Sequence, residues 1–180
     1  FANLEQAIDT RDVAKLYEYW CFFELGQHLS KVFDLPPKAA LTISDEKGLE
    51  EQAKIEWAEK ASLVFNRSFP LGRGQSYSVK LRPDFFLEIE EVLAPRRRLV
   101  FDAKFRFTTG DWHTVEDDDI HKMHTYRDAL DAQAAVVLYP GDQPIFYDAD
   151  FGPMMDEVTL AGILHAHGVG AFCMEPHEET

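Results

Sequence analysis

Two short motifs carry residue types that could do chemistry together. Arg82-Pro83-Asp84 is followed, eighteen positions after its aspartate, by Asp102-Ala103-Lys104. Carboxylates and backbone carbonyls are the oxygen ligands that hard cations such as Mg²⁺ prefer. A divalent cation next to a fixed ammonium group is the equipment needed to hydrolyse a phosphodiester. Whether the two motifs can act together depends on the chain segment that joins them.

That segment is typical of a β-hairpin. Two apolar and aromatic runs, 85–89 and 99–107, are separated by a proline and by three consecutive arginines, Arg96 to Arg98. Side chains alternate between the faces of a strand. Asp102 and Lys104 should therefore share one face. The members of that face are Val100, Asp102, Lys104 and Arg106, and the opposite, apolar face consists of Leu99, Phe101, Ala103, Phe105 and Phe107.

The hairpin predicts a rigid site with distinct roles for its residues. Asp84 and Asp102 could supply two carboxylates to a divalent cation, and the backbone carbonyl of Ala103 could add a third oxygen. Lys104 could orient a water molecule or stabilise charge in the transition state. An ordinary exposed strand would also carry Asp-x-Lys, and Pro-Asp often opens a turn, so the motif depends on its structural context.

Length and composition limit the class of protein. The 180 residues predict a single domain over 1–180 with a substantial core. No segment is apolar for long enough to cross a bilayer, and no signal peptide precedes the first helix, which favours a cytoplasmic location. Because the sequence starts at Phe1, we expect a C-terminal fragment of a larger protein. Cys21 and Cys173 lie in apolar surroundings and are predicted to be free, buried thiols.

The net charge of −14 counts against strong autonomous binding of nucleic acid. Affinity for phosphate backbones depends mainly on Lys and Arg. A metal site collects carboxylates, and the bound cation offsets part of their charge. A partner or a further domain could also deliver the substrate. Local basic groups are available at Arg73, Lys80, Arg82 and Arg96 to Arg98.

A first helix is expected over residues 9–32. Glu18 stands four positions before Phe22 and seven before Leu25, so it shares a helix face with apolar residues. A carboxylate there is costly unless it is paired or bound to a cation. Glu18 is therefore either a residue at the edge of the stripe that reaches solvent or a further ligand of the metal.

The rest of the chain predicts a mixed α/β architecture. Residues 120–132 form a helix on which Lys122 and Tyr126 share a face. Residues 45–60 form either a helix or an irregular insertion. Strands are expected at 41–43, 61–69, 77–84, 134–139, 145–147 and 170–174, and a last helix at 157–167. This order predicts an α/β sandwich with a central mixed β-sheet and helices on both faces.

Four motifs in this order resemble the PD-(D/E)xK nuclease superfamily. They are Leu16-Tyr17-Glu18-Tyr19-Trp20, Arg82-Pro83-Asp84 with Val100-Phe101-Asp102-Ala103-Lys104-Phe105-Arg106, the helix from Asp119 to Leu130, and Val136-Val137-Leu138-Tyr139-Pro140-Gly141. The similarity is greatest to McrC-like and RecB-like nuclease domains. Their helix carries Gln-x₃-Tyr, and here Lys122 replaces the Gln while Tyr126 is kept.

The resemblance implies a restriction-endonuclease-like α/β/α sandwich and a DNA endonuclease that uses Mg²⁺, with Mn²⁺ as a substitute, in restriction or phage defence. By position, Glu18, Asp84 and Asp102 would bind the metal and Lys104 would assist catalysis. Candidates for positioning phosphate or substrate are Lys122, Tyr126 and Arg106. A McrB-like motor GTPase or ATPase and a dimer are the implied partners besides DNA.

Two other functions compete with this one. A nuclease-like binding or scaffolding module that does not cut would agree with the negative net charge. A histidine-based metalloenzyme would have to use His121 and His124, or His165 and His167. These spacings do not complete a set of ligands such as His-x-x-x-His, so exposed helix histidines are the simpler interpretation.

Overall fold

The computed structural model describes residues 10–41, 43–44, 48–49, 52–72, 75–91, 95–105, 117–154 and 158–176. Within these ranges the helices are α2 (Thr10–Phe33), α3 (Asp117–Ala129) and α4 (Leu160–Ile163). The strands are β1 (Lys38–Ala40), β2 (Ile43–Ser44), β3 (Gly48–Leu49), β4 (Lys54–Trp57), β5 (Ala61–Phe65), β6 (Phe85–Ile89), β7 (Arg97–Ala103), β8 (Ala134–Tyr139), β9 (Ile145–Asp148), β10 (Gly152–Met154) and β11 (Gly168–Cys173).

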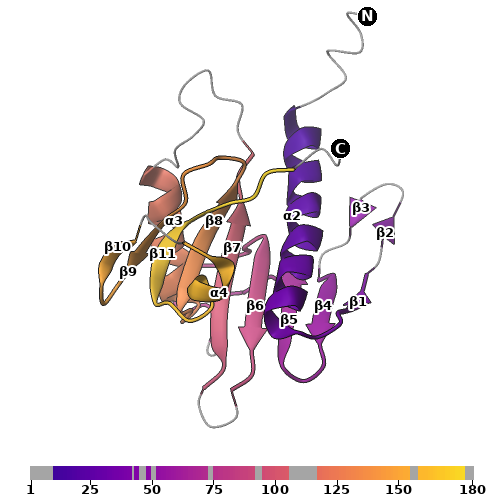
Figure 1. Ribbon diagram of the computed structural model, residues 1–180, viewed down its shortest axis with the longest axis horizontal. Coiled ribbons are helices and arrows are strands. Elements are labelled where there is room, and N and C mark those ends of the chain that lie inside the picture. Colours follow the sequence, from indigo (N-terminus) through magenta and orange to yellow (C-terminus); the bar gives the residue numbers. More distant parts are fainter. Residues whose placement is uncertain are drawn as a thin grey trace, which may run out of the picture.

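One large sheet organises the molecule (Figure 1). Among the described residues it contains nine strands in the order β1-β4-β5-β6-β7-β8-β11-β9-β10, and β2 pairs separately with β3. Strands β7, β8 and β11 run parallel to one another. The remaining described strand pairs are antiparallel. The sheet is therefore mixed, as the sequence predicted, with its parallel part at the centre.

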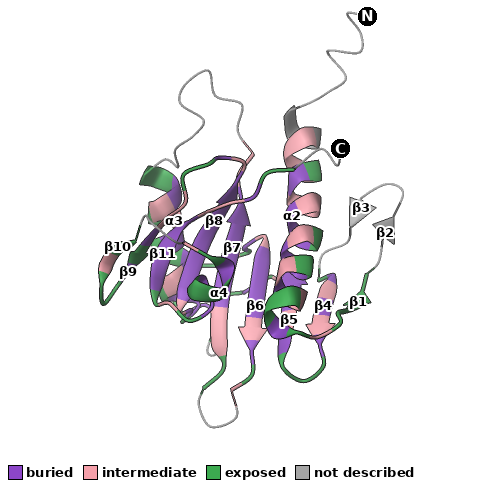
Figure 2. Cartoon of the chain, viewed as in Figure 1, coloured by how far each residue is buried: buried purple, intermediate pink, exposed green. Residues whose placement is uncertain are grey.

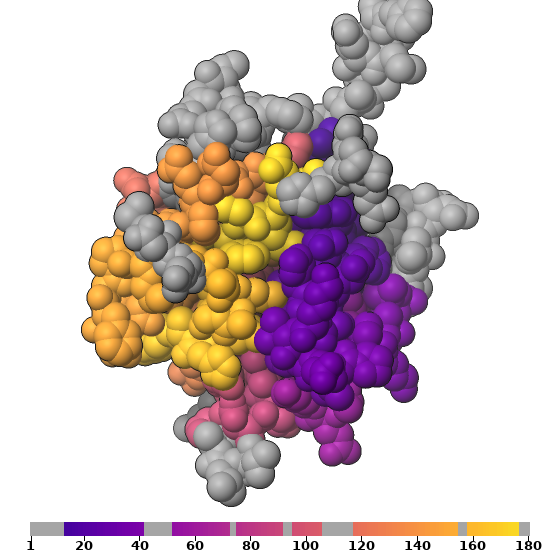
Figure 3. Space-filling model, viewed as in Figure 1, coloured from indigo at the N-terminus to yellow at the C-terminus, as the bar shows by residue number. Residues whose placement is uncertain are grey.

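Helices cover both faces of this sheet. Leu99, Phe101 and Ala103 of β7 pack in a core with α2 and α4. Val100 of the same strand packs in a second core with α3. The predicted α/β sandwich is thus confirmed, and so is the apolar face of β7 within its described residues; Phe107 lies outside them. Figure 3 shows α2 and the C-terminal segment side by side on the near face.

The centre of the sheet is the most deeply buried part of the protein (Figure 2). All six residues of β8 are buried, as is typical of a parallel strand that is covered on both sides. The neighbouring strand β7 is buried from Leu99 to Ala103. Asp102 belongs to this buried run, one residue before β7 ends. No helix in the described part of the chain combines the length and the apolarity that crossing a membrane requires.

Several predicted elements agree with the structure. The segment at 45–60 differs, because part of it has the two-residue period of a strand. The first helix, the hairpin strands and the buried strand at 134–139 are confirmed within a few residues. The prediction of a helix or irregular insertion at 45–60 is wrong, because this segment contains β3 and β4. In β4, buried Ile55 and Trp57 alternate with Lys54 and Glu56, which is the period of a strand.

Two further predictions are corrected. The predicted strand at 77–84 is reduced to a single bridge, from Leu81 to Phe69, and Tyr77 and Val79 are exposed. The predicted helix at 157–167 is reduced to the single turn of α4. Its following amides bond three residues back, from His165 to Gly162 and from Ala166 to Ile163, so the α-helical ladder stops before β11 begins.

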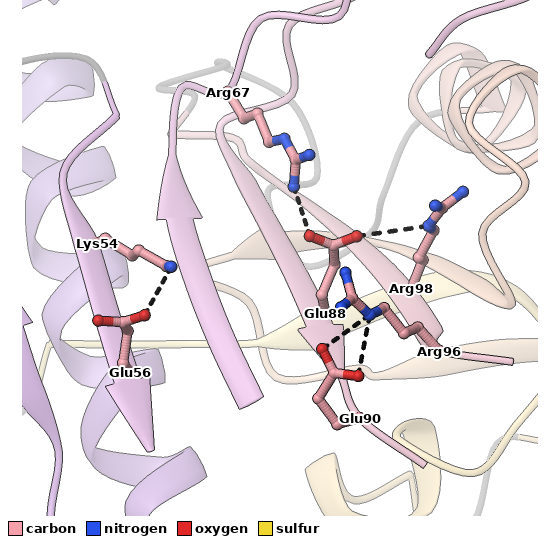
Figure 4. Close-up of polar contacts among 7 residues, drawn as sticks. All are labelled: Lys54, Glu56, Arg67, Glu88, Glu90, Arg96 and Arg98. Atoms are coloured by element: carbon pink, nitrogen blue, oxygen red, sulfur yellow. Dashed lines mark hydrogen bonds and ion pairs between the residues drawn. The ribbon is translucent and has the colours of Figure 1, made fainter. Parts of the chain in front are cut away.

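The three arginines of the hairpin are bound by acidic neighbours. Glu88 accepts a hydrogen bond from Arg67 at 2.6 Å and pairs with Arg98 at 3.6 Å. Arg96 contacts Glu90 at 2.8 Å. Figure 4 shows Glu88 between Arg67 and Arg98, Arg96 beside Glu90, and the pair Lys54–Glu56 on β4. The third arginine, Arg97, pairs with Glu91 and also donates to the carbonyl of Leu164 at 2.6 Å.

These arginines also lie at the wrong end of the hairpin to serve the predicted site. Glu88 pairs with Arg98 in the register, whereas Phe85 pairs with Phe101 at the other end of the strands. Arg98 and Asp102 are four residues apart along β7, which corresponds to about 13 Å. The run from Arg96 to Arg98 therefore fastens the hairpin and α4, and it is not a basic patch beside the catalytic motifs.

Replacing Phe101 with alanine should loosen the strand that carries Asp102. Phe101 is fully buried, so Phe101→Ala should lower the free energy of unfolding by about 3–5 kcal/mol. Urea unfolding measures this loss. Tyr147→Ala, at a side chain that is 41% exposed, is the control and should change stability by about 0.5 kcal/mol or less. Equal effects of the two substitutions would contradict the central position of β7.

Candidate active site

The register of β6 and β7 brings the two aspartates together. Phe85 pairs with Phe101 in this antiparallel pair. Continuing the register by one residue places Asp84 opposite Asp102, on the same face of the sheet. The backbone N–H of Ala103 donates to Oδ2 of Asp84 at 2.8 Å, which fixes that carboxylate against the end of β7. The predicted pairing of Asp84 with the Asp-x-Lys motif is thus present.

Asp102 is almost completely buried, with 1% of its surface exposed. Two lysines compensate for its charge. The ammonium of Lys104 forms an ion pair with Oδ2 of Asp102, as the alternation of faces along the strand predicted. Lys122, from α3, lies 3.0 Å from Oδ1 and 3.1 Å from Oδ2. A buried carboxylate without such partners would be strongly unfavourable.

Helix α3 delivers Lys122 because its other side chains are anchored in the core. Met123 and Tyr126 are buried against the strands β7, β8 and β11. Lys122 precedes Met123 and lies one helical turn before Tyr126, so it projects at the margin of this core. Its ammonium is 5.2 Å from the centre of the Tyr126 ring. The predicted common face of Lys122 and Tyr126 is therefore confirmed.

Tyr126 also supports the segment that carries Asp84. Its hydroxyl donates to the backbone carbonyl of Arg82 at 3.4 Å, a long hydrogen bond. Burial raises the pKa of Tyr126, and the nearby charges of Asp102 and Asp84 raise it further. The side chain consequently remains a neutral donor. Sequence reasoning missed this link to Arg82, because no spacing along the chain relates a helix residue to a backbone carbonyl of a distant loop.

The electrostatic environment is unfavourable for the charge of Asp84. Burial, followed by the negative charges of Asp102 and Glu18, raises its pKa from 3.8 to about 7. The positive charge of Lys104 and the hydrogen bond from Ala103 act in the opposite direction but are weaker. Burial alone would lower the pKa of Lys122, yet the charge and hydrogen bonds of Asp102 outweigh it and raise that pKa. The acidic groups thus favour the charged form of Lys122 and disfavour a negative charge on Asp84.

Glu18 lies on a different helix from Lys122 and pairs with a lysine of its own helix. It lies on α2, which packs on the opposite face of the sheet from α3. Its carboxylate is partly buried and accepts a hydrogen bond from Lys15 at 2.7 Å. Its charge still raises the pKa of Asp84. Glu18 therefore affects the site through the electric field of its charge, which acts on Asp84. Its role as a metal ligand stays a prediction.

The remaining predicted residues are placed only in part. Ala103 is buried at the end of β7, and its role as a carbonyl ligand stays a prediction. Arg106 lies outside the described residues. Across the described ranges, no three side chains of the types His, Cys, Asp and Glu form a metal-binding group. The donors present nevertheless fit a hard divalent cation, because two residues with carboxylate side chains, Asp84 and Asp102, lie opposite each other at the end of the β6–β7 pair.

The cysteines and histidines have other environments. Cys21 and Cys173 are both free thiols, and Cys21 is buried while Cys173 is only partly so. Burial raises the pKa of Cys21 to about 12, which makes it a poor nucleophile. His165 lies 2.9 Å from a guanidinium nitrogen of Arg97. His167 lies 2.5 Å from one of Arg127.

Asp84→Asn should stabilise the metal-free protein above neutral pH. Because the pKa of Asp84 is higher in the folded state than its ordinary value of 3.8, the folded state keeps a proton that the unfolded chain loses. Stability contributed by this proton is present at low pH and disappears as the pH rises through about 7. The substitution removes the unfavourable charge and should raise Tm by about 2–4 °C at pH 8, equivalent to about 1 kcal/mol.

Thermal unfolding in a chelating buffer at pH 8 and at pH 5 checks this prediction. The gain should shrink at pH 5, where Asp84 is already protonated in the folded state. Asp128→Asn is a suitable control, because Asp128 is exposed on α3 and its hydrogen bond from Tyr77 lies at the surface. A loss of stability at pH 8 in Asp84→Asn would contradict the proposed origin of the shift.

Comparison with known proteins agrees with this geometry. A family model described as the PD-(D/E)XK nuclease superfamily matches residues 15–144. The match includes α2 from Lys15 onward, the β6–β7 pair, α3 and β8, and so every described residue of the site. No curated protein and no solved structure matches the chain. The family match covers most of the sequence, and the chain therefore belongs to the PD-(D/E)XK nuclease superfamily.

Proposed function

We propose that this nuclease domain is a Mg²⁺-dependent DNA endonuclease that acts in restriction or phage defence. The observation that carries the proposal is the position of Asp84 opposite Asp102, with Lys104 on the same strand face. Membership of the nuclease superfamily supports hydrolysis of a phosphodiester as the reaction. Mn²⁺ is proposed as a substitute, because it accepts the same oxygen ligands.

The two aspartates are the proposed metal ligands. Asp84 is oriented by the N–H of Ala103, and Asp102 is held at the buried end of β7. The carbonyl of Ala103 and the carboxylate of Glu18 are proposed as further oxygen ligands. A divalent cation held there would supply Lewis-acid stabilisation of charge on the phosphate and lower the pKa of the attacking water.

The lysines and Tyr126 complete the proposed catalytic group. Lys104 places a positive charge beside Asp102, where it can orient the attacking water or stabilise the charge that develops on the phosphate. Lys122 and Tyr126 share a face of α3. They are proposed to position a phosphate group next to Lys104. Arg106 follows two residues after Lys104 and is proposed as an additional contact to the substrate.

Delivery of DNA is proposed to depend on a partner. The net charge is −14, and the arginines at the tip of the hairpin are paired with Glu88, Glu90 and Glu91. These features support weak binding of DNA by the isolated domain. The similarity of the motifs to McrC-like and RecB-like domains leads us to propose a McrB-like motor GTPase or ATPase as that partner. A dimer is a further proposal.

A nuclease-like module that binds partners without cutting is the alternative. The same negative charge and the same paired arginines favour it. The buried Asp102 beside Asp84 speaks against it, because a cluster of acidic groups is costly to keep without a cation. A folded wild-type chain that neither binds Mn²⁺ nor cuts DNA or RNA is the result expected from this alternative.

Removing either Asp102 or Lys104 should abolish metal-dependent cleavage. Asp102→Asn and Lys104→Ala should each lower the cleavage rate by about 100-fold or more, since each loses charge stabilisation at the reacting phosphate. The measurement is cleavage of supercoiled plasmid with Mg²⁺ or Mn²⁺, with an RNA substrate in parallel. Arg96→Gln removes a paired arginine at the far end of the hairpin and should retain the wild-type rate. Undiminished cleavage in both site variants would refute the proposal.

A further inference from the structure

Lys122 makes an unusual contact for a residue whose expected task is to position phosphate. Its ammonium is almost equidistant from the two carboxylate oxygens of Asp102, at 3.0 and 3.1 Å. Lys104 contacts Oδ2 of the same carboxylate. Both oxygens of Asp102 are therefore already hydrogen-bonded to cationic groups. These are the oxygens that the proposed metal site requires.

The two lysines offset most of the negative charge of the metal-free site. Asp84, Asp102 and, through its field, Glu18 oppose the ammonium groups of Lys104 and Lys122. A divalent cation that bound while both lysines stayed in place would leave an excess of positive charge. The cation would also compete with an ammonium for the oxygens of Asp102, because like charges at such short distances repel strongly in a partly buried site.

The two lysines differ in their freedom to leave. The side chain of Lys104 is 23% exposed and follows the rigid strand β7. The side chain of Lys122 is 42% exposed and extends from α3 at the margin of the core. Lys122 can move its ammonium into solvent by rotating its flexible stem, whereas Lys104 has less space.

We propose that Lys122 is an exchangeable counter-ion of Asp102. It holds the buried carboxylate in the metal-free protein and leaves it when a divalent cation binds, so it lowers the affinity of the site for that cation. The inference rests on the proposed metal site at Asp84 and Asp102. It assigns to Lys122 a task that precedes any contact with phosphate, and a neutral glutamine at this position could not perform it.

Calorimetric titration with Mn²⁺ tests the first consequence. Lys122→Gln keeps a hydrogen-bond donor but loses the charge, so it should bind Mn²⁺ about tenfold more tightly than the wild type or better. Lys122→Arg keeps the charge and should stay close to the wild type. Lys31→Gln is the matched control, because it removes the same charge from an exposed position at the end of α2. Equal or weaker binding by Lys122→Gln would overturn the inference.

Chemical labelling of lysines tests the second consequence in the wild-type protein. Saturation with Mg²⁺ should release the Lys122 ammonium from Asp102 and raise its rate of reaction with an amine-specific reagent, read by mass spectrometry. The rate at Lys31 should not change. An unchanged rate at Lys122 under saturating Mg²⁺ would overturn the inference, and this experiment does not depend on the folding of a variant.

Asp102→Asn distinguishes failure of the proposed metal site from failure of the counter-ion role of Lys122. If wild type and Asp102→Asn bind Mn²⁺ equally, the proposed metal site is wrong, and the role of Lys122 is rejected with it. If Asp102→Asn loses binding while Lys122→Gln and the wild type bind alike, the metal site stands and only the counter-ion role is rejected. Tighter binding by Lys122→Gln together with lost binding by Asp102→Asn supports both.

Discussion

The buried carboxylate of Asp102 is the constraint on which the arrangement of the site depends. A carboxylate that is 1% exposed must be compensated by cations or hydrogen bonds. Compensation comes from two directions, from Lys104 on the same strand and from Lys122 on α3. The second contact requires α3 to lie over β7 and β8 at a fixed position. The buried side chains of Met123 and Tyr126 set that position. The same helix therefore packs against the sheet and supplies a cation to Asp102.

The pairing of β6 with β7 supplies the second requirement. The register that joins Phe85 to Phe101 leaves Asp84 beside the end of β7, where the N–H of Ala103 binds its carboxylate. The hydroxyl of Tyr126 reaches the carbonyl of Arg82, two residues before Asp84. The loop that carries one aspartate is thereby connected to the helix that neutralises the other. A displacement of α3 would consequently disturb both acidic groups.

Several basic groups of this acidic chain are paired with carboxylates in the described part of the structure. Glu88, Glu90 and Glu91 neutralise the arginines at the tip of the hairpin, far along the strands from Asp102. Near the aspartates, the two lysines are occupied by Asp102 itself. These pairs support the proposal that a partner delivers the DNA.

The sequence by itself determined the features that depend on local periodicity. Alternation along β7 placed Asp102 and Lys104 on one face, the apolar run of β8 marked a buried strand, and the spacing of Lys122 and Tyr126 placed them on one helix face. The period-two pattern of β4 was also present in the sequence but was obscured by its many charged neighbours. The superfamily and the sandwich architecture followed from the order of these motifs.

Only the tertiary structure decided which charges meet. It brought Lys122 onto Asp102, left Glu18 paired with Lys15 on the other side of the sheet, and turned Arg96 and Arg98 toward glutamates. Periodicity states which face of its own element a side chain occupies, but an ion pair depends on the distance between two elements. That distance is set by how the buried side chains of both elements pack, and packing is a property of the assembled core.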